Sequence, residues 1–189
     1  RRFNQLYCGV DPHAQDSDHL KAGGLFPIPE ALIGRVKRLV GVGGPDANGR
    51  LLKMSKSLNN AIYLSDSSDT LHQKVMQLYT DPNRIRATDP GTVENNPLWI
   101  FHDAFNPDTK WIEEAKERYR SGTIGDVECK KKLVEVLEAV LSPMRERRER
   151  YASDPGECIN ILKSGKEKAN EFAEETLRKV KEVIHQKYW

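Results

Sequence analysis

Apolar positions along the chain follow different patterns before and after about residue 66. Residues 11–29 are rich in Asp, His, Gly and Pro without periodicity, which predicts a loop. Residues 36–60 contain a β-branched run and then an Asn-Gly pair, which predicts a strand, a turn, a short strand and a mobile loop. After residue 66 the apolar residues recur at helical spacing. The pattern therefore predicts a short α/β part followed by helices.

Helix-capping residues predict where these later helices begin. Thr70 with Gln73 has the form of a capping box, and the helix it opens should run to Asp81-Pro82. Three more starts are expected further along, because Asn96 precedes a proline and two aspartates precede apolar periodic segments. They lie at Asn96, Asp108 and Asp126. Pro143 should kink the helix that begins at Asp126, since its ring clashes with the preceding turn.

The final helical segment is expected to span residues 157–188 and to break near Gly165. Its apolar residues recur on one face, which predicts burial. They are Ala169, Phe172, Ala173, Val180 and Ile184.

Composition narrows the class of protein. Residues 1–80 carry 10 Lys and Arg against 7 Asp and Glu, and the formal net charge of the whole chain is +2. A generally basic nucleic-acid binder is not indicated, so any RNA contact must use local clusters. The widely spaced Cys8, Cys129 and Cys158 favour free thiols over a disulfide framework or a zinc site. The sequence has no long apolar run and no signal-like start, which favours a cytoplasmic protein without membrane insertion.

A glycine-containing stretch, "GPDANGRL" at residues 44–51, partly matches a phosphate-binding P-loop. Arg50 stands where that motif needs lysine, and Leu51 replaces the hydroxyl residue that would bind Mg²⁺. A hairpin turn is the favoured interpretation.

The stretch "LLKMSKSLNN" at residues 51–60 carries the strongest candidate chemistry. Two lysines on long flexible stems can approach a polyphosphate, while hydroxyls and free amides donate at shorter range. A loop that closes as charge develops would stabilise the transition state more than the ground state. The spacing alone is equally compatible with an exposed basic loop that has no function.

The complete "KMSKS" sequence resembles the signature loop of class I aminoacyl-tRNA synthetases. The wider chain resembles the carboxyl-terminal half of a bacterial-type tryptophanyl-tRNA synthetase, through "RRFNQLY", "VMQLYTDPNRIR", "LSPMRERRERY" and "SGKEKANEFAEETLRKVKEV". The fold class this implies is α/β plus all-α. Residues 1–66 would end a Rossmann-type catalytic domain, and residues 67–189 would form a helical anticodon-binding domain. The last helix, about residues 166–188, would pack back toward the catalytic domain.

The resemblance implies roles for the loop. Lys56 would contact the ATP phosphates and stabilise departing pyrophosphate while tryptophanyl-adenylate forms, and Lys53 would support it. Met54 and Ser55 would shape the loop against the nucleotide, and Ser57 would anchor its end. Mg²⁺ would arrive with ATP, held through the phosphates, and no tightly bound cofactor or metal site of the protein's own is implied.

The resemblance also implies partners and a larger parent protein. The family's HIGH-type motif, the tryptophan-binding residues and most of the homodimer interface are expected ahead of Arg1, so this chain alone is expected to be inactive. The parent would act on tryptophan, ATP and tRNA(Trp). Two alternatives stay open: a portion of a tyrosyl-tRNA synthetase, which commonly continues into a further basic domain, and a non-catalytic helical RNA-binding module.

Anticodon recognition would use basic side chains of the helical part, with Arg84 and Arg86 favoured because a loop at a helix end can present them outward. The other candidates are Lys130, Arg145 and Arg148. The alternating "RERRER" is also typical of a solvated, salt-bridged helix face. Trp99 and Trp111 fit buried helix faces better than base stacking. His102 and Asp103 cannot form a catalytic relay, because adjacent helical residues point about 100° apart.

Overall fold

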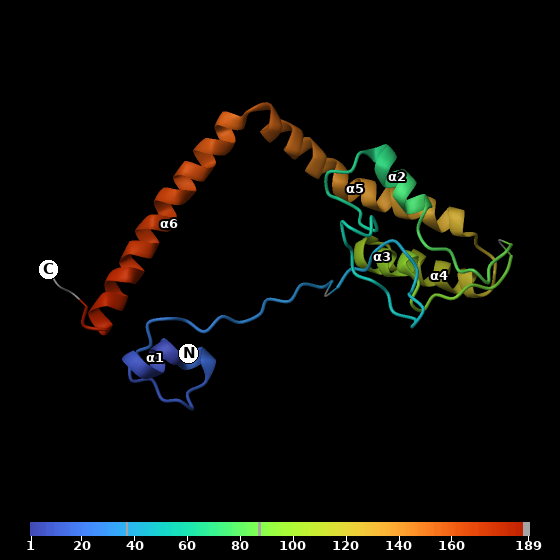
Figure 1. Cartoon of the computed structure of the whole chain (residues 1–189). Coiled ribbons are helices and arrows are strands. Elements are labelled where there is room, and N and C mark those ends of the chain that lie inside the picture. The colour runs from blue at the N-terminus through green and yellow to red at the C-terminus, as the bar shows by residue number, and fades with distance from the viewer. Residues whose placement is uncertain (37, 87, 187–189) are drawn as a thin grey trace. The chain divides into compact units, whose positions relative to one another are not determined.

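The computed structural model describes residues 1–36, 38–86 and 88–186, and its described regular elements are helical (Figure 1). The chain divides into two compact units, each described here by itself. One unit is Ile33–Arg150, which contains the loop and most of the helices. The other comprises Arg1–Leu32 and the chain from Tyr151 onward. None of the described helices is both long and apolar enough to cross a membrane.

Four helices build the unit Ile33–Arg150 around one apolar core. They are α2 (Ser68–Met76), α3 (Pro97–Phe105), α4 (Thr109–Arg120) and α5 (Asp126–Ser153), the last of which extends a few residues beyond the unit. In Figure 1, α2 lies along one side of α5, and α3 and α4 lie along the other. The largest fully buried core side chains are Trp99, Tyr119, Phe101, Leu71 and Leu78. Burial of these faces is the main stabilising contribution.

The helix starts agree with the caps predicted from the sequence at three of four places. Asn96 accepts the Leu98 N–H ahead of Pro97, Asp108 accepts the Trp111 N–H, and α5 begins at Asp126. The capping-box prediction at Thr70 was wrong, because Ser67 is the N-cap and accepts the Thr70 N–H. α2 also ends at Met76, before Asp81-Pro82. α5 continues through Pro143.

Residues 36–60 form a turn with a single antiparallel bridge, between Val40 and Lys53, and the described residues of this stretch contain no strand. The predicted pair of strands is therefore wrong, although the turn between them is present. Three glycines and Pro45 lie just after the bridge, and glycine and proline both weaken a ladder. A two-stranded pairing with so little support is marginal in water.

Close packing explains why two of these positions, 41 and 44, are occupied by glycine. A Cβ on Gly44 would overlap the Tyr79 ring, and a Cβ on Gly41 would overlap the Asn60 side chain. The backbone of residues 41–44 can therefore lie against the start of the helical part. A hydrogen bond from the Tyr79 N–H to the Val42 carbonyl, at 3.0 Å, joins the same two segments.

The second unit contains α1 (Arg2–Tyr7), a short 3-10 helix η1 (Asp16–Asp18) and α6 (Pro155–Val183). Asn4 organises the amino-terminal loop, since its side-chain oxygen accepts the N–H groups of Leu25 and Phe26 at 3.1 and 3.0 Å. Cys8, Cys129 and Cys158 are free thiols, as predicted.

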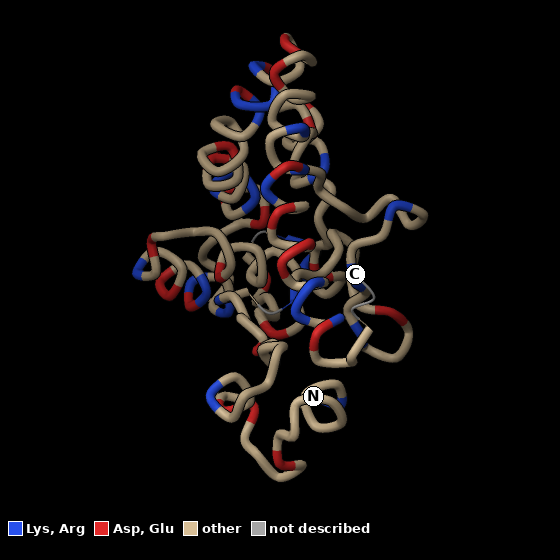
Figure 2. The backbone as a smooth tube through the Cα atoms, turned by 90° about the vertical axis from the view of Figure 1, so that its left-hand side faces the viewer, with Lys and Arg blue, Asp and Glu red and all other residues tan. Residues whose placement is uncertain are grey.

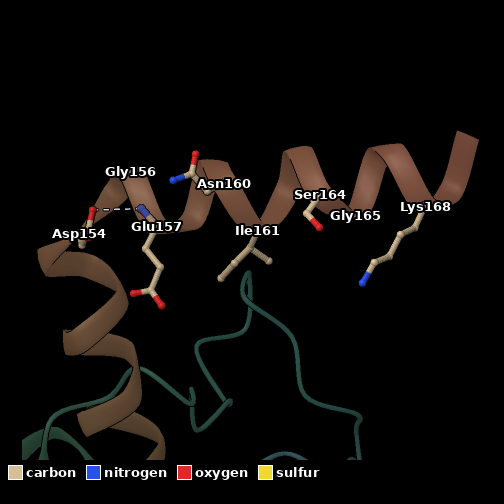
Figure 3. Close-up of a pocket in the computed structure, with 8 residues that line it drawn as sticks. All are labelled: Asp154, Gly156, Glu157, Asn160, Ile161, Ser164, Gly165 and Lys168. Carbon is tan, nitrogen blue, oxygen red and sulfur yellow. Dashed lines mark hydrogen bonds between the residues drawn. The ribbon is translucent and has the colours of Figure 1, made fainter.

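α6 runs without interruption through Gly165, so the predicted break there was wrong. The expected burial of its apolar face is also not observed among the described residues, and Phe172 is 74% exposed. Figure 3 shows the first turns of this helix, where Asp154 accepts the Glu157 N–H at 3.0 Å. Ile161, Ser164 and Lys168 follow along it. They help to line a hollow along one side of the helix, together with Asp154 and Glu157.

Candidate nucleotide loop and the cations of the helical part

The KMSKS loop presents its two lysines to solvent and is held at its base. Lys53 and Lys56 are exposed, whereas Met54 and Ser55 are half-buried. The Ser55 N–H donates to the Asn60 side-chain oxygen at 2.7 Å, and the Asn60 amide donates to the Lys53 carbonyl at 3.2 Å. The Ser55 and Ser57 hydroxyl oxygens lie 2.9 Å apart. Both lysines are thus exposed on a loop whose backbone is bonded to Asn60 at its base.

The stretch before the loop is a hairpin turn, as predicted, and not a P-loop. The Asp46 carboxylate accepts the N–H groups of Asn48 and Arg50, both at 2.9 Å. Gly49 has a φ of +73°, in the left-handed region that glycine adopts without strain. The described residues directly after this turn, 51–67, contain no helix.

A hollow of about 600 Å³ lies beside the hairpin and includes Lys53 in its lining. Arg38, Arg50 and Asp46 also line it, so cations outnumber carboxylates there. The Arg38 guanidinium donates to the Leu51 carbonyl at 3.0 Å. The lining suits a polyanion better than a neutral or cationic ligand.

Arg84 does not point outward, so this part of the RNA-binding prediction was wrong. The residue is 7% exposed, and its guanidinium lies 3.1 Å from the Asp126 carboxylate and 4.1 Å from the Tyr119 ring centre. It also donates to the Ile124 carbonyl at 2.8 Å. Tyr119 completes the cluster by donating to Asp126 at 2.7 Å. Arg84 therefore fastens the segment after α2 to the start of α5.

Lys130 is likewise an interior residue, only 4% exposed. Its ammonium donates to the carbonyls of Met76 and Leu78, at 3.1 and 2.6 Å, and to the Thr80 hydroxyl at 2.9 Å. Burial lowers the pKa of Lys130, which the nearby Asp126 partly offsets. Because all three donors are used inside the protein, Lys130 cannot contact RNA in this conformation.

The remaining predicted RNA contacts fall into two groups. Arg145 is half-buried and pairs with Glu138, and it also donates to the Asp66 carbonyl and the Ser68 hydroxyl. Arg86 and Arg148 are exposed. In Figure 2, basic and acidic segments alternate along the helices, consistent with the nearly balanced charge of the sequence. Of the five predicted RNA contacts, only Arg86 and Arg148 are therefore exposed.

His102 has a structural environment, as the sequence predicted. Its Nε2 lies 3.1 Å from the Cys129 carbonyl, and its Nδ1 lies 3.3 Å from the Asn106 amide. Burial lowers the pKa of His102 to about 4. Burial also raises the pKa of the Cys129 thiol to about 12. Trp99 is buried and Trp111 is partly buried, in agreement with the core positions predicted for both.

Asn60 is the loop residue that the sequence interpretation missed. It is buried and bonds the first and middle residues of the signature motif, Lys53 and Ser55, yet in the sequence it is only the second of two adjacent asparagines. Nothing in the spacing distinguishes the buried Asn60 from the exposed Asn59. The only feature of the sequence that indicates burial of Asn60 is its position directly before the apolar Ala61 and Ile62.

Comparison with known proteins identifies the class. Residues 2–142 match the family model described as "tRNA synthetases class I (W and Y)", and the chain belongs to this family. A tryptophan–tRNA ligase of Chlamydia caviae is 44% identical over 97% of this chain and 47% of its own length. One from Clostridium longisporum is 47% identical over 86% of this chain and 45% of its own length. These relatives confirm the predicted resemblance to tryptophanyl-tRNA synthetases and do not favour the tyrosyl alternative.

A solved structure agrees with this assignment. The tryptophanyl-tRNA synthetase of Campylobacter jejuni in complex with ADP and tryptophan matches with a TM-score of 0.66 and 29% identity, over 86% of this chain and 48% of that one. The chain therefore has a class I tRNA synthetase fold, with helices as its regular elements in the described part. It spans about half the length of the relatives it matches.

Proposed function

We propose that the chain is the portion of a tryptophan–tRNA ligase that contains the ATP-phosphate loop and the tRNA-binding helices. The observation that supports this most directly is the pair of exposed lysines, Lys53 and Lys56, on a loop with a fixed base. The tryptophan specificity of the relatives supports the amino acid, and the ADP and tryptophan bound to the Campylobacter jejuni protein support the substrates.

In the whole enzyme, a carboxylate oxygen of tryptophan attacks the α-phosphorus of ATP. The bond from that phosphorus to the bridging oxygen breaks, and pyrophosphate leaves with Mg²⁺ bound to its oxygens. Lys56 stabilises the charge that develops on the leaving group, and Lys53 assists it. Lysine suits this task because its ammonium is a compact charge that can follow a moving group. A hydroxyl of the terminal ribose of tRNA(Trp) then attacks the carbonyl carbon of tryptophanyl-adenylate, and AMP leaves.

The helical part would bind the anticodon stem-loop through its exposed cations, Arg86 and Arg148. This proposal retains the division into an end of the Rossmann-type domain, residues 1–66, and a helical domain, residues 67–189. The exposed apolar side chains of α6, among them Phe172 and Leu177, support the proposal that this helix packs back toward the catalytic domain. A cytoplasmic homodimer is the assembly that the family implies for the parent.

The test is ATP–pyrophosphate exchange by the full-length parent protein carrying Lys56→Ala. We expect a fall of about 10² to 10³ in the exchange rate, the size seen when one preorganised charge contact is removed. Lys110→Ala is the matched control, because Lys110 is an exposed lysine on α4 with a side chain 86% exposed. An unchanged rate for Lys56→Ala would contradict a catalytic loop and would support the helical RNA-binding module.

A further inference from the structure

Asn60 holds the KMSKS loop from inside, through both hydrogen-bonding groups of its side chain. Its oxygen accepts the Ser55 N–H at 2.7 Å, and its amide nitrogen donates to the Lys53 carbonyl at 3.2 Å. The two bonds lie on either side of Met54, and Ser55 directly precedes Lys56. Because both bonded groups belong to the backbone, Asn60 constrains the direction in which each lysine stem leaves the chain.

Asn60 is in turn fixed by the segment that precedes the hairpin. Its carbonyl accepts the Val42 N–H at 2.9 Å, and its side chain lies against Gly41, where a Cβ would overlap the amide. The Val42 carbonyl accepts the Tyr79 N–H at 3.0 Å. A continuous set of bonds therefore runs from Ser55 through Asn60 and Val42 to the segment after α2.

We propose that Asn60 is a positioning residue for adenylate formation, acting through Lys56; this inference rests on the proposed function. Asn60 does not need to touch the nucleotide. Its role is to keep the loop in the one backbone arrangement from which the Lys56 ammonium reaches the departing phosphate. Without Asn60, the Ser55 N–H and the Lys53 carbonyl lose their partner, and the loop samples arrangements that place the lysine elsewhere.

A double-mutant cycle in the full-length parent tests this role by ATP–pyrophosphate exchange. In the wild-type background, Asn60→Ala should lower the exchange rate about tenfold, as expected if the loss of two part-buried hydrogen bonds displaces Lys56. In the Lys56→Ala background, the same change should lower the rate less than about twofold, because the group that Asn60 positions is already absent. A residue needed only for stability would lower the rate by the same factor in both backgrounds.

Two further variants sharpen the test. Gly41→Ala should imitate Asn60→Ala, because the new methyl group must displace the Asn60 amide. Asn59→Gly is the matched control: Asn59 is exposed, and its φ of +48° suits glycine, so its exchange rate should equal that of the wild type. If Asn60→Ala fails to fold, Asn60→Asp replaces it in the double-mutant cycle, because aspartate keeps an oxygen that can accept the Ser55 N–H.

The possible outcomes separate this inference from the proposed function. Equal losses in the two backgrounds, or a wild-type rate for Asn60→Ala, would overturn the positioning role while Lys56 remained catalytic. A wild-type rate for Lys56→Ala would overturn the proposed function and this inference together. Faster hydrogen exchange of the Ser55 amide in Asn60→Ala, with an unchanged thermal midpoint, would support a loosened loop in a folded protein.

Discussion

The loop and the helical core both use basic residues, but in opposite ways. Lys56 lies exposed on the loop, whereas Lys130 is buried and donates to two carbonyls and a hydroxyl. Arg86 and Arg84 repeat the contrast within three residues, since the first is exposed and the second is packed on Tyr119. A buried cation fastens elements together, and an exposed one remains available for a ligand. Side-chain burial therefore distinguishes the two roles better than residue type.

The largest effect on stability is expected from Arg84→Met, which breaks the buried pair with Asp126. The variant leaves a largely buried carboxylate without its cation, a change that typically costs about 3 to 5 kcal/mol. Chemical denaturation of the variant and the wild type measures the difference.

Arg86→Ala is the matched control for Arg84, because Arg86 is exposed. Its free energy of unfolding should change by less than about 0.5 kcal/mol. In the full-length parent it should weaken tRNA binding, measured at fixed salt concentration. Equal destabilisation by the two substitutions would contradict the contrast between buried and exposed cations, and unchanged tRNA affinity would remove Arg86 from the proposed contacts.

A pH-dependent loss of stability is expected from His102 in the helical core. Both ring nitrogens have hydrogen-bond partners when the imidazole is neutral. Nε2–H is directed at the Cys129 carbonyl, and Nδ1 accepts from the Asn106 amide. Burial lowers its folded-state pKa to about 4, below the value of about 6.5 expected in the unfolded chain. The unfolded state therefore binds more protons between these values, and stability falls as the pH falls. The loss should reach about 2 to 3 kcal/mol by pH 4.5.

His102→Gln isolates this contribution from the carboxylates that titrate in the same range. Denaturation midpoints from pH 7 to pH 4.5 should fall less steeply for His102→Gln than for the wild type, although the variant starts from lower stability. His72→Gln is the matched control for the loss of a histidine, because His72 is exposed on α2. Parallel slopes for His102→Gln and the wild type would contradict a buried neutral imidazole.

The helical part was the more predictable from sequence. Asn96 and Asp108 cap helices as expected, because a cap depends on a few neighbouring residues. The start at Thr70 was misplaced because Ser67 offers an equivalent hydroxyl three residues earlier. Pairing of residues 36–60 into strands depends on non-local partners, and local β-branched composition could not determine it.

The candidate site also contains some features that the sequence predicts and others that depend on the fold. The KMSKS motif and its exposed lysines follow from a contiguous stretch of sequence, so they could be identified directly. The buried state of Arg84 and Lys130 depends on distant partners, Asp126 for the first and the end of α2 for the second. The role of Asn60 depends on Ser55 and Gly41 meeting in space. None of these three could be derived from spacing along the chain.

A smaller loss of stability than that of Arg84→Met is expected from a change at Gly44, which joins the loop region to the helical part. In Gly44→Ala the new Cβ would overlap the Tyr79 ring, and the displacement should cost about 1 to 3 kcal/mol of stability. Gly43→Ala is the control next to it, since no atom lies within 4 Å of its added Cβ, and stability should stay equal or rise slightly. Urea denaturation compares the two. Equal midpoints would mean that the Tyr79 ring yields at little cost, and that the close approach of Gly44 to Tyr79 does not limit stability.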